Sequence, residues 1–137
     1  MVESKFIDST LLNRQQANIP YLTVDNFPDL GLLTSLRFLE WVSENPDGVV
    51  SLPTGKTPEY FIKWTHYILN NWNKSELEGL RKKNGLLIDK KPSFSQLRFV
   101  QIDEFYPLNS NQQNSFYYYV NKYYIKGFGL SLDQALL

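Results

Sequence analysis

The 137-residue chain is predicted to be an α/β protein. Short apolar runs typical of buried strands occur at residues 49–52 and 97–102, and stretches with helical spacing of apolar residues lie before, between and after them. Strands that alternate with helices form parallel sheets with right-handed crossovers. Ligands bind such sheets at the carboxyl ends of the strands. The turns at residues 53–58 and 103–107 follow these ends directly, so they are the candidate functional segments.

Composition excludes several classes of function. The 42% hydrophobic content indicates one globular domain, and 14 basic against 14 acidic residues provide no general attraction to nucleic acid. The chain has no cysteine and one histidine, which excludes disulfides, thiolate metal sites and multi-histidine metal sites. No run of about 20 apolar residues is present to span a membrane, and the first residues lack an apolar signal region. We therefore expect a cytoplasmic protein that binds neither nucleic acid nor membrane.

The first half of the chain is predicted to hold an arm and a helix. Residues 1–28 lack periodicity and are interpreted as an N-terminal arm on a body formed by residues 29–137. A helix is expected from Asp29 to the turn at residues 45–48, which has strong turn chemistry. Its apolar positions are Leu32, Leu36, Leu39 and Val42.

The stretch from Val49 to Pro58 is predicted to be a buried strand, a tight turn and a helix start. Gly55 permits a close backbone approach, Pro58 suits the first helical position, and Thr54 and Thr57 are candidate caps. A helix start directs several N–H groups and a positive dipole end at one spot, which suits a phosphate. The alternative is an ordinary strand-to-helix turn.

The helix expected at residues 58–71 is followed by a more polar region. Its apolar stripe consists of Phe61, Trp64, Ile68 and Trp72. His66 lies off this stripe and is interpreted as a surface or contact residue. A short helix is expected near residues 75–83, and the basic residues around it are interpreted as a solvated face. They are Arg81, Lys82, Lys83, Lys90 and Lys91.

The second strand, at residues 97–102, leads directly into Asp103 and Glu104. Carboxylates at a strand end suit proton transfer, and the alternative is that they cap a helix or loop. After a turn-rich segment, a further helix is expected, which Gly127 and Gly129 end. Its predicted stripe is Phe116, Tyr119, Val120 and Tyr123.

Nucleotide binding is not expected at the Gly55-Lys56-Thr57 turn. A nucleotide P-loop needs a glycine five positions before its Gly-Lys pair. Val50 occupies that position, and Pro58 follows the turn at once.

Two motifs carry a resemblance to a known family. Residues 51–58 read Ser-Leu-Pro-Thr-Gly-Lys-Thr-Pro, and residues 102–106 read Ile-Asp-Glu-Phe-Tyr, with Asn-Ser-Phe-Tyr later at residues 114–117. The first motif is similar to the phosphate loop of the glucosamine-6-phosphate deaminase/isomerase family, which is related to the 6-phosphogluconolactonases. The other motif resembles that family's Asp-Glu-Tyr segment and Ser-Tyr helix start. The resemblance spans residues 30–137.

The resemblance implies a three-layer α/β/α sandwich with a mainly parallel sheet, of which this chain is an N-terminal part. It implies a hydrolase that converts glucosamine 6-phosphate and water to fructose 6-phosphate and ammonia, with no cofactor and no metal. Asp103 would move a proton at the sugar's C2, with Glu104 as a supporting acid. The residues implied for phosphate binding are Thr54, Gly55, Lys56 and Thr57. An incomplete sheet leaves an unpaired edge, so we also expect a homo-oligomer.

The chain departs from the family pattern at several positions. Lys56 stands where the family has Gly or Ser, and Ser51 replaces a glycine. The family's ring-opening histidine lies in a later Asp-Gly-His segment that nothing here matches, and His66 is not placed to replace it. We therefore expect the N-terminal part of a longer enzyme, inactive by itself.

Two alternatives remain open at this point. A 6-phosphogluconolactonase-like hydrolase is one, although Phe105 stands where that branch usually has Arg. The other is a non-catalytic module that binds a sugar phosphate.

Overall fold

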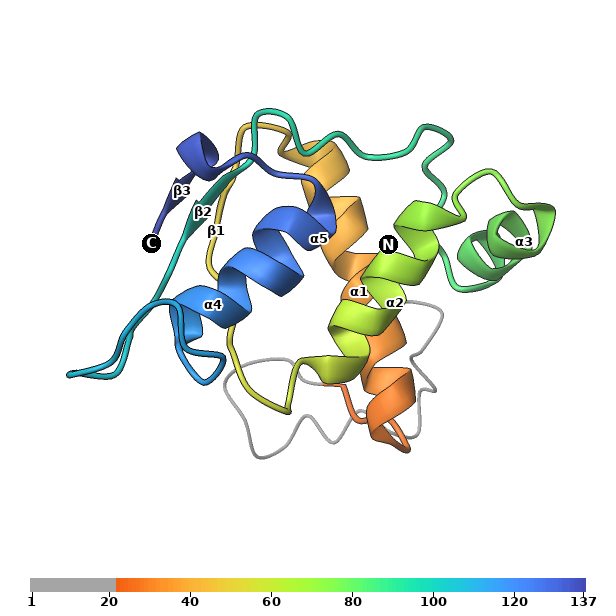
Figure 1. Ribbon diagram of the computed structural model, residues 1–137. Coiled ribbons are helices and arrows are strands. Elements are labelled where there is room, and N and C mark those ends of the chain that lie inside the picture. Colours follow the sequence, from red (N-terminus) through yellow and green to blue (C-terminus); the bar gives the residue numbers. More distant parts are fainter. Residues whose placement is uncertain (1–21) are drawn as a thin grey trace.

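The structure, a computed structural model, describes residues 22–137 (Figure 1). No helix in this range is long and apolar enough to cross a membrane. Of the predicted arm, residues 1–21 lie outside the described residues, whereas Leu22 and Val24 pack against the core. The elements in chain order are α1 (Phe27–Glu44), β1 (Val49–Val50), α2 (Glu59–Asn70), α3 (Ser75–Lys83), β2 (Arg98–Val100), α4 (Phe116–Val120), a π-helical segment (Asn121–Ile125), α5 (Lys126–Phe128), a 3₁₀ turn (Leu132–Gln134) and β3 (Ala135–Leu136).

The three strands form a parallel sheet in the order β1-β2-β3. Val50 is opposite Phe99, and Phe99 is opposite Ala135. Both crossovers join neighbouring parallel strands in the same direction, so right-handed connections place their helices on one face of the sheet. In Figure 1 the helices lie together on one side of the three strands. The predicted α/β class is confirmed.

Residues 22–137 cover only one face of the strands. Val50, Phe99 and Ala135 belong to the core or pack against it. On the opposite face, Val49 is 61% exposed and Leu136 is 71% exposed. The prediction that the first strand is fully buried is therefore wrong, because the described helices cover only the face that carries Val50.

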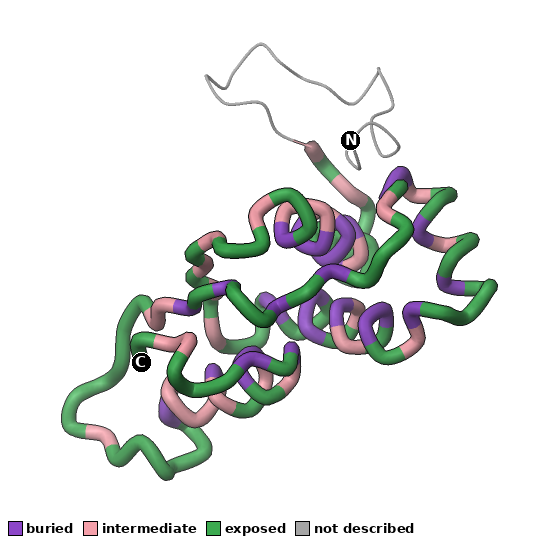
Figure 2. Tube along the Cα trace, turned by 90° about the horizontal axis from the view of Figure 1, so that it is seen from above, coloured by how far each residue is buried: buried purple, intermediate pink, exposed green. Residues whose placement is uncertain are grey.

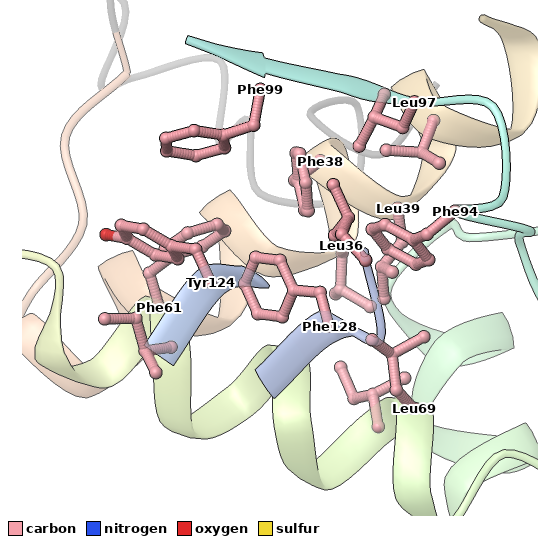
Figure 3. Close-up of a cluster of buried hydrophobic side chains, with 14 of the residues drawn as sticks. Leu36, Phe38, Leu39, Phe61, Leu69, Phe94, Leu97, Phe99, Tyr124 and Phe128 are labelled. Carbon is pink, nitrogen blue, oxygen red and sulfur yellow. The ribbon is translucent and has the colours of Figure 1, made fainter. Parts of the chain in front are cut away.

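The core lies between the covered face of the sheet and the helices, and Figure 2 shows the buried residues on the inward sides of the helices. Phe99 of β2 stacks on Tyr124 with ring centroids 5.7 Å apart (Figure 3). Phe38 of α1 meets Phe61 of α2 edge-on at 5.4 Å. Of the four predicted apolar positions of α1, Leu32 is only half-buried and the other three are fully buried. These three are Leu36, Leu39 and Val42.

Helix α2 is fixed closely against α1. A Cβ on Gly31 of α1 would lie 2.5 Å from the Tyr60 Cβ, so only glycine permits this approach. Ser35 donates a buried hydrogen bond of 2.8 Å to the Phe61 carbonyl, and Thr65 donates to Ser35 over 3.0 Å. These contacts set the position of the N-terminus of α2 and of the loop that precedes it.

The last helix differs from its prediction. Of the predicted stripe, Val120 is fully buried, but Tyr119 and Tyr123 are only half-buried. The π-helical segment interrupts the regular spacing, so the residues that face the core after Val120 are Tyr124, Ile125 and Phe128. Gly129 ends the helix with φ of 78°, as predicted, whereas Gly127, the other predicted stop, lies inside α5.

Candidate functional site

The two predicted functional segments begin at the same edge of the sheet. Because β1 and β2 are parallel neighbours, the loop over residues 51–58 and the loop over residues 101–115 both leave the carboxyl ends of their strands. In Figure 1 both loops extend from the lower end of the strands, with α4 beside them. The Ser51 hydroxyl donates to the Val100 carbonyl over 2.6 Å and links the two strand ends.

The loop before α2 depends on glycine for its backbone conformation. Gly55 has φ of 92°, in the left-handed region that other residues rarely adopt. A Cβ at this position would meet nothing within 4 Å, so the conformation, rather than space within the chain, requires glycine. The N-cap of α2 is Pro58, and no side chain caps this helix. The prediction that Thr54 and Thr57 act as caps is therefore wrong.

The same loop presents unpaired backbone donors. Within residues 22–137, none of the N–H groups of residues 54–57 donates a hydrogen bond to the protein. Gly55, Lys56 and Thr57 are exposed and Thr54 is half-buried, so the loop is open to solvent. Consecutive free N–H groups before a helix of 12 residues suit an anion, and the Lys56 ammonium adds positive charge.

Two tyrosines of the last helix contact this loop. The Tyr119 hydroxyl donates to the Gly55 carbonyl over 2.8 Å. The Tyr124 hydroxyl donates to the Pro53 carbonyl over 2.5 Å. Apolar spacing and motifs did not predict these contacts. The only signal in the sequence was the run of tyrosines in the helix that follows the second motif.

Glu104 joins the second loop to the start of α4. Its carboxylate accepts from the Ser115 hydroxyl at 2.6 Å and from the N–H groups of Phe116 at 3.0 Å and Tyr117 at 2.9 Å. The Phe105 N–H also donates to it, over 2.9 Å. Burial alone would raise the pKa of Glu104, but these hydrogen bonds together lower it to about 2. Glu104 is therefore ionised at neutral pH, and its contacts are those of a helix cap.

Asp103 is exposed in the loop three residues beyond the end of β2, and it is the less constrained of the two acids. Its carboxylate makes no hydrogen bond within the described part of the chain. Its backbone carbonyl accepts from the Gln101 side-chain amide over 2.7 Å. Free acceptor oxygens are what a general base needs to reach a substrate proton.

His66 of α2 packs against the last helix. Its Nε2 lies 2.9 Å from the Tyr123 carbonyl oxygen, and its ring meets Phe128 edge-on at 5.4 Å. A Cβ on Gly127 would overlap that Nε2, so glycine is needed here. The interpretation of His66 as a contact residue is confirmed.

The basic cluster is not a uniform solvated face. Arg81 is buried and stacks on the Trp72 ring at 3.7 Å, with a 2.7 Å hydrogen bond to the Trp72 carbonyl. Lys82 is exposed and pairs with Glu78 over 2.6 Å. Arg81 therefore joins α3 to the end of α2, which corrects the prediction for that residue.

Known proteins resemble this chain over a part of their length. A glucosamine-6-phosphate deaminase of Bacillus velezensis is 27% identical over 116 residues, which cover 85% of this chain and 41% of the relative. The glucosamine-6-phosphate deaminase of Clostridium botulinum strain Hall is 28% identical over 99 residues, or 72% of this chain and 33% of the relative. No protein-family model matches the chain.

A solved structure gives the corresponding match in three dimensions. It is a monomeric glucosamine-6-phosphate deaminase, described as a missing link of the NagB superfamily, with TM-score 0.64 and 20% identity. The match covers 82% of this chain and 39% of that protein. The predicted fold class and the resemblance to the deaminases are confirmed, and the chain spans about two fifths or less of the proteins that it matches.

Proposed function

We propose that this chain is the N-terminal part of a glucosamine-6-phosphate deaminase, which converts glucosamine 6-phosphate and water to fructose 6-phosphate and ammonia. One observation carries the proposal: the free N–H groups of residues 54–57 and the free carboxylate of Asp103 follow neighbouring parallel strands at one edge of the sheet. A hexose 6-phosphate carries its anion at one end and its reacting carbons at the other. Two loops of different chemistry suit such a substrate.

The first loop binds the phosphate. The N–H groups of Thr54, Gly55, Lys56 and Thr57 donate to its oxygens, and the dipole of α2 and the Lys56 ammonium stabilise its charge. These interactions are the same in the ground state and in the transition state. The loop therefore governs the affinity for substrate more than the rate of the chemical step.

In the second loop, Asp103 transfers the proton of the sugar. Its carboxylate takes the C2 proton of the open-chain amino sugar and delivers it to C1. The amine loses one proton and the C1 carbonyl oxygen gains one, so that C1 becomes a CH2OH group and C2 carries an imine. Water adds to C2 of that imine and ammonia leaves, which yields the ketose and gives the reaction its hydrolytic character. Glu104, with a pKa of about 2, has no proton to donate at neutral pH, so we assign it to positioning the loop.

Among residues 22–137, no histidine lies at the candidate site to open the sugar ring. The only histidine is His66, and its ring packs on Phe128. In the family that this chain resembles, the ring-opening histidine belongs to a later Asp-Gly-His segment. We therefore propose that ring opening depends on a part of the family domain that these residues do not match.

The test is calorimetric titration of the 137-residue chain with glucosamine 6-phosphate, fructose 6-phosphate and unphosphorylated glucosamine. We expect both phosphates to bind and glucosamine not to bind, with no ammonia released at ordinary enzyme rates. Failure to bind any hexose phosphate would contradict the proposed function. Rapid ammonia release would contradict the incomplete site, and hydrolysis of 6-phosphogluconolactone would favour the lactonase alternative, which the deaminase matches do not support.

Self-association and a cytoplasmic location stay predictions. The outer face of the sheet exposes Val49 and Leu136, and Ile102 beyond the end of β2 is 68% exposed. An apolar face of this kind favours association. Sedimentation velocity over a wide concentration range tests it, and a monomer throughout, as the structural relative is described, would contradict it.

A further inference from the structure

The last helix contacts the candidate phosphate loop through two hydroxyls that its π-helical segment brings to one side. Tyr119 and Tyr124 are five residues apart, which in a regular α-helix places side chains about 140° apart. A π-helical turn bonds residues five apart, so it brings such residues nearly in line. Tyr119 precedes the segment Asn121–Ile125 by two residues and Tyr124 lies within it, and their ring centroids are 6.0 Å apart.

Both hydroxyls hydrogen-bond to carbonyls of the loop, at Gly55 and at Pro53. A trans peptide group is planar, so its C=O and N–H point in opposite directions. The Pro53 carbonyl shares a peptide group with the Thr54 N–H, and the Gly55 carbonyl shares one with the Lys56 N–H. Because the two carbonyls point toward the helix, these two N–H groups point away from it. Neither has a hydrogen-bond partner in residues 22–137.

We propose that Tyr119 and Tyr124 are positioning residues for the phosphate loop, which orient the Thr54 and Lys56 N–H groups toward the anionic group of the ligand. This inference rests on the proposed function. A loop that contains glycine and has four unpaired donors has many conformations available, and fixing it before the ligand arrives lowers the entropic cost of binding. The helix that follows the Asp103-Glu104 motif thus holds residues 54–57 in the conformation that binds the ligand.

The surroundings of the two tyrosines support this role. Tyr124 is fully buried and stacks on Phe99, while Tyr119 packs on Tyr123 at 4.7 Å. Burial raises the pKa of both hydroxyls above the ordinary tyrosine value. Both therefore remain protonated donors at neutral and mildly alkaline pH.

The test compares Tyr119→Phe and Tyr124→Phe with Tyr118→Phe. Tyr118 lies on the same helix, and its hydroxyl has no hydrogen bond among the described residues, so it is a matched control. The probes are glucosamine 6-phosphate and inorganic phosphate, titrated against each full chain while the backbone amide signals of residues 54–57 are followed by NMR. A thermal melt of each variant separates stability from affinity.

We expect Tyr119→Phe and Tyr124→Phe each to weaken binding by about threefold to tenfold, since each removes one hydrogen bond that fixes the loop. The amide signals of Thr54 and Lys56 should move in these variants before ligand is added, whereas Tyr118→Phe should leave both readouts unchanged. If Tyr124→Phe does not fold, the affinity and amide signals of Tyr119→Phe test the inference, because Tyr119 is only half-buried.

Unchanged affinity in Tyr119→Phe, with or without a lower melting temperature, would overturn the inference and leave the proposed function intact. If the parent chain binds neither probe, the proposed function fails, and the inference that rests on it fails with it. Ligand binding by the parent chain therefore distinguishes the two failures.

Discussion

The two loops at the edge of the sheet are attached to the same helix by opposite chemistry. In the loop before α2, hydroxyls from the helix donate to the backbone carbonyls of Pro53 and Gly55. In the loop after β2, the side chain of Glu104 accepts from the N-terminal N–H groups of the helix. The first arrangement leaves backbone donors free, and the second leaves the Asp103 carboxylate free. One loop is therefore suited to an anion and the other to a proton.

The attachments also differ in how they respond to pH. Hydroxyl-to-carbonyl hydrogen bonds do not titrate near neutral pH, whereas the bonds to Glu104 require its ionised form. The folded-state pKa of Glu104, about 2, lies below its ordinary value of 4.5. Its contribution to stability is therefore complete above about pH 4.5 and is lost as the pH falls toward 2. Acid should weaken the attachment of the loop that carries Asp103 before it affects the proposed phosphate loop, residues 54–57.

The largest effect is expected from a substitution that removes the base of the second loop and leaves the first loop unchanged. Asp103→Asn should slow proton exchange at C1 of fructose 6-phosphate in D2O by on the order of a hundredfold or more, because the amide is not a base. Because the ring of fructose 6-phosphate opens spontaneously, the test does not need a ring-opening group on the protein. Calorimetry should show nearly normal binding, since the phosphate loop is unchanged. Exchange at the parent rate would make Asp103 a structural residue.

The next largest effect is expected from a substitution that distorts the proposed phosphate loop and leaves Asp103 unchanged. Gly55→Val should weaken binding of glucosamine 6-phosphate by about tenfold or more, because a β-branched residue at φ of 92° shifts the loop. Thr57→Val is the matched control, since it keeps the side-chain shape and removes only a hydroxyl. Calorimetry should show a smaller loss for Thr57→Val. Equal losses would indicate that side chains, rather than the backbone, bind the phosphate.

A smaller effect is expected where the second loop joins the helix. Ser115 is the N-cap of α4 and also donates to Glu104 over 2.6 Å. Ser115→Ala should lower the free energy of unfolding by about 1 kcal/mol, the usual value for a lost N-cap. Urea denaturation measures this change, and Ser93→Ala, on an exposed loop, is the control. A neutral result for Ser115→Ala would contradict the capping role.

The smallest effect is a change of pH dependence. Glu104→Gln keeps the size of the side chain but removes the group that titrates, so the fall in melting temperature between pH 5 and pH 3 should become shallower than in the parent. Glu76→Gln is the comparison: Glu76 is exposed on α3, and its carboxylate accepts from the Tyr67 hydroxyl but caps no helix. An unchanged pH profile in Glu104→Gln would show that other acids control acid unfolding.

Local sequence patterns determined the order of the main helices and of the first two strands, and the location of the candidate site, but not β3 or the π-helical segment. The helical spacing of Leu36, Leu39 and Val42, the apolar runs at the strands, and the breaks at residues 45–48 and Gly129 all reflect preferences within one or two turns of chain. The expectation that residues 53–58 and Asp103 lie at one edge needed only the rule that neighbouring strands joined by helices are parallel.

Only the tertiary structure decided what holds these segments in place. The Tyr124 hydroxyl reaches a carbonyl 71 residues earlier in the chain, and Glu104 reaches N–H groups 12 and 13 residues later. Such contacts depend on the rotation of the last helix about its axis, which the π-helical segment alters and apolar spacing does not reveal. The exposure of Val49 likewise depends on which face of the sheet the helices cover. Spacing along the chain specifies which residues share a face, whereas packing between distant elements decides what that face meets.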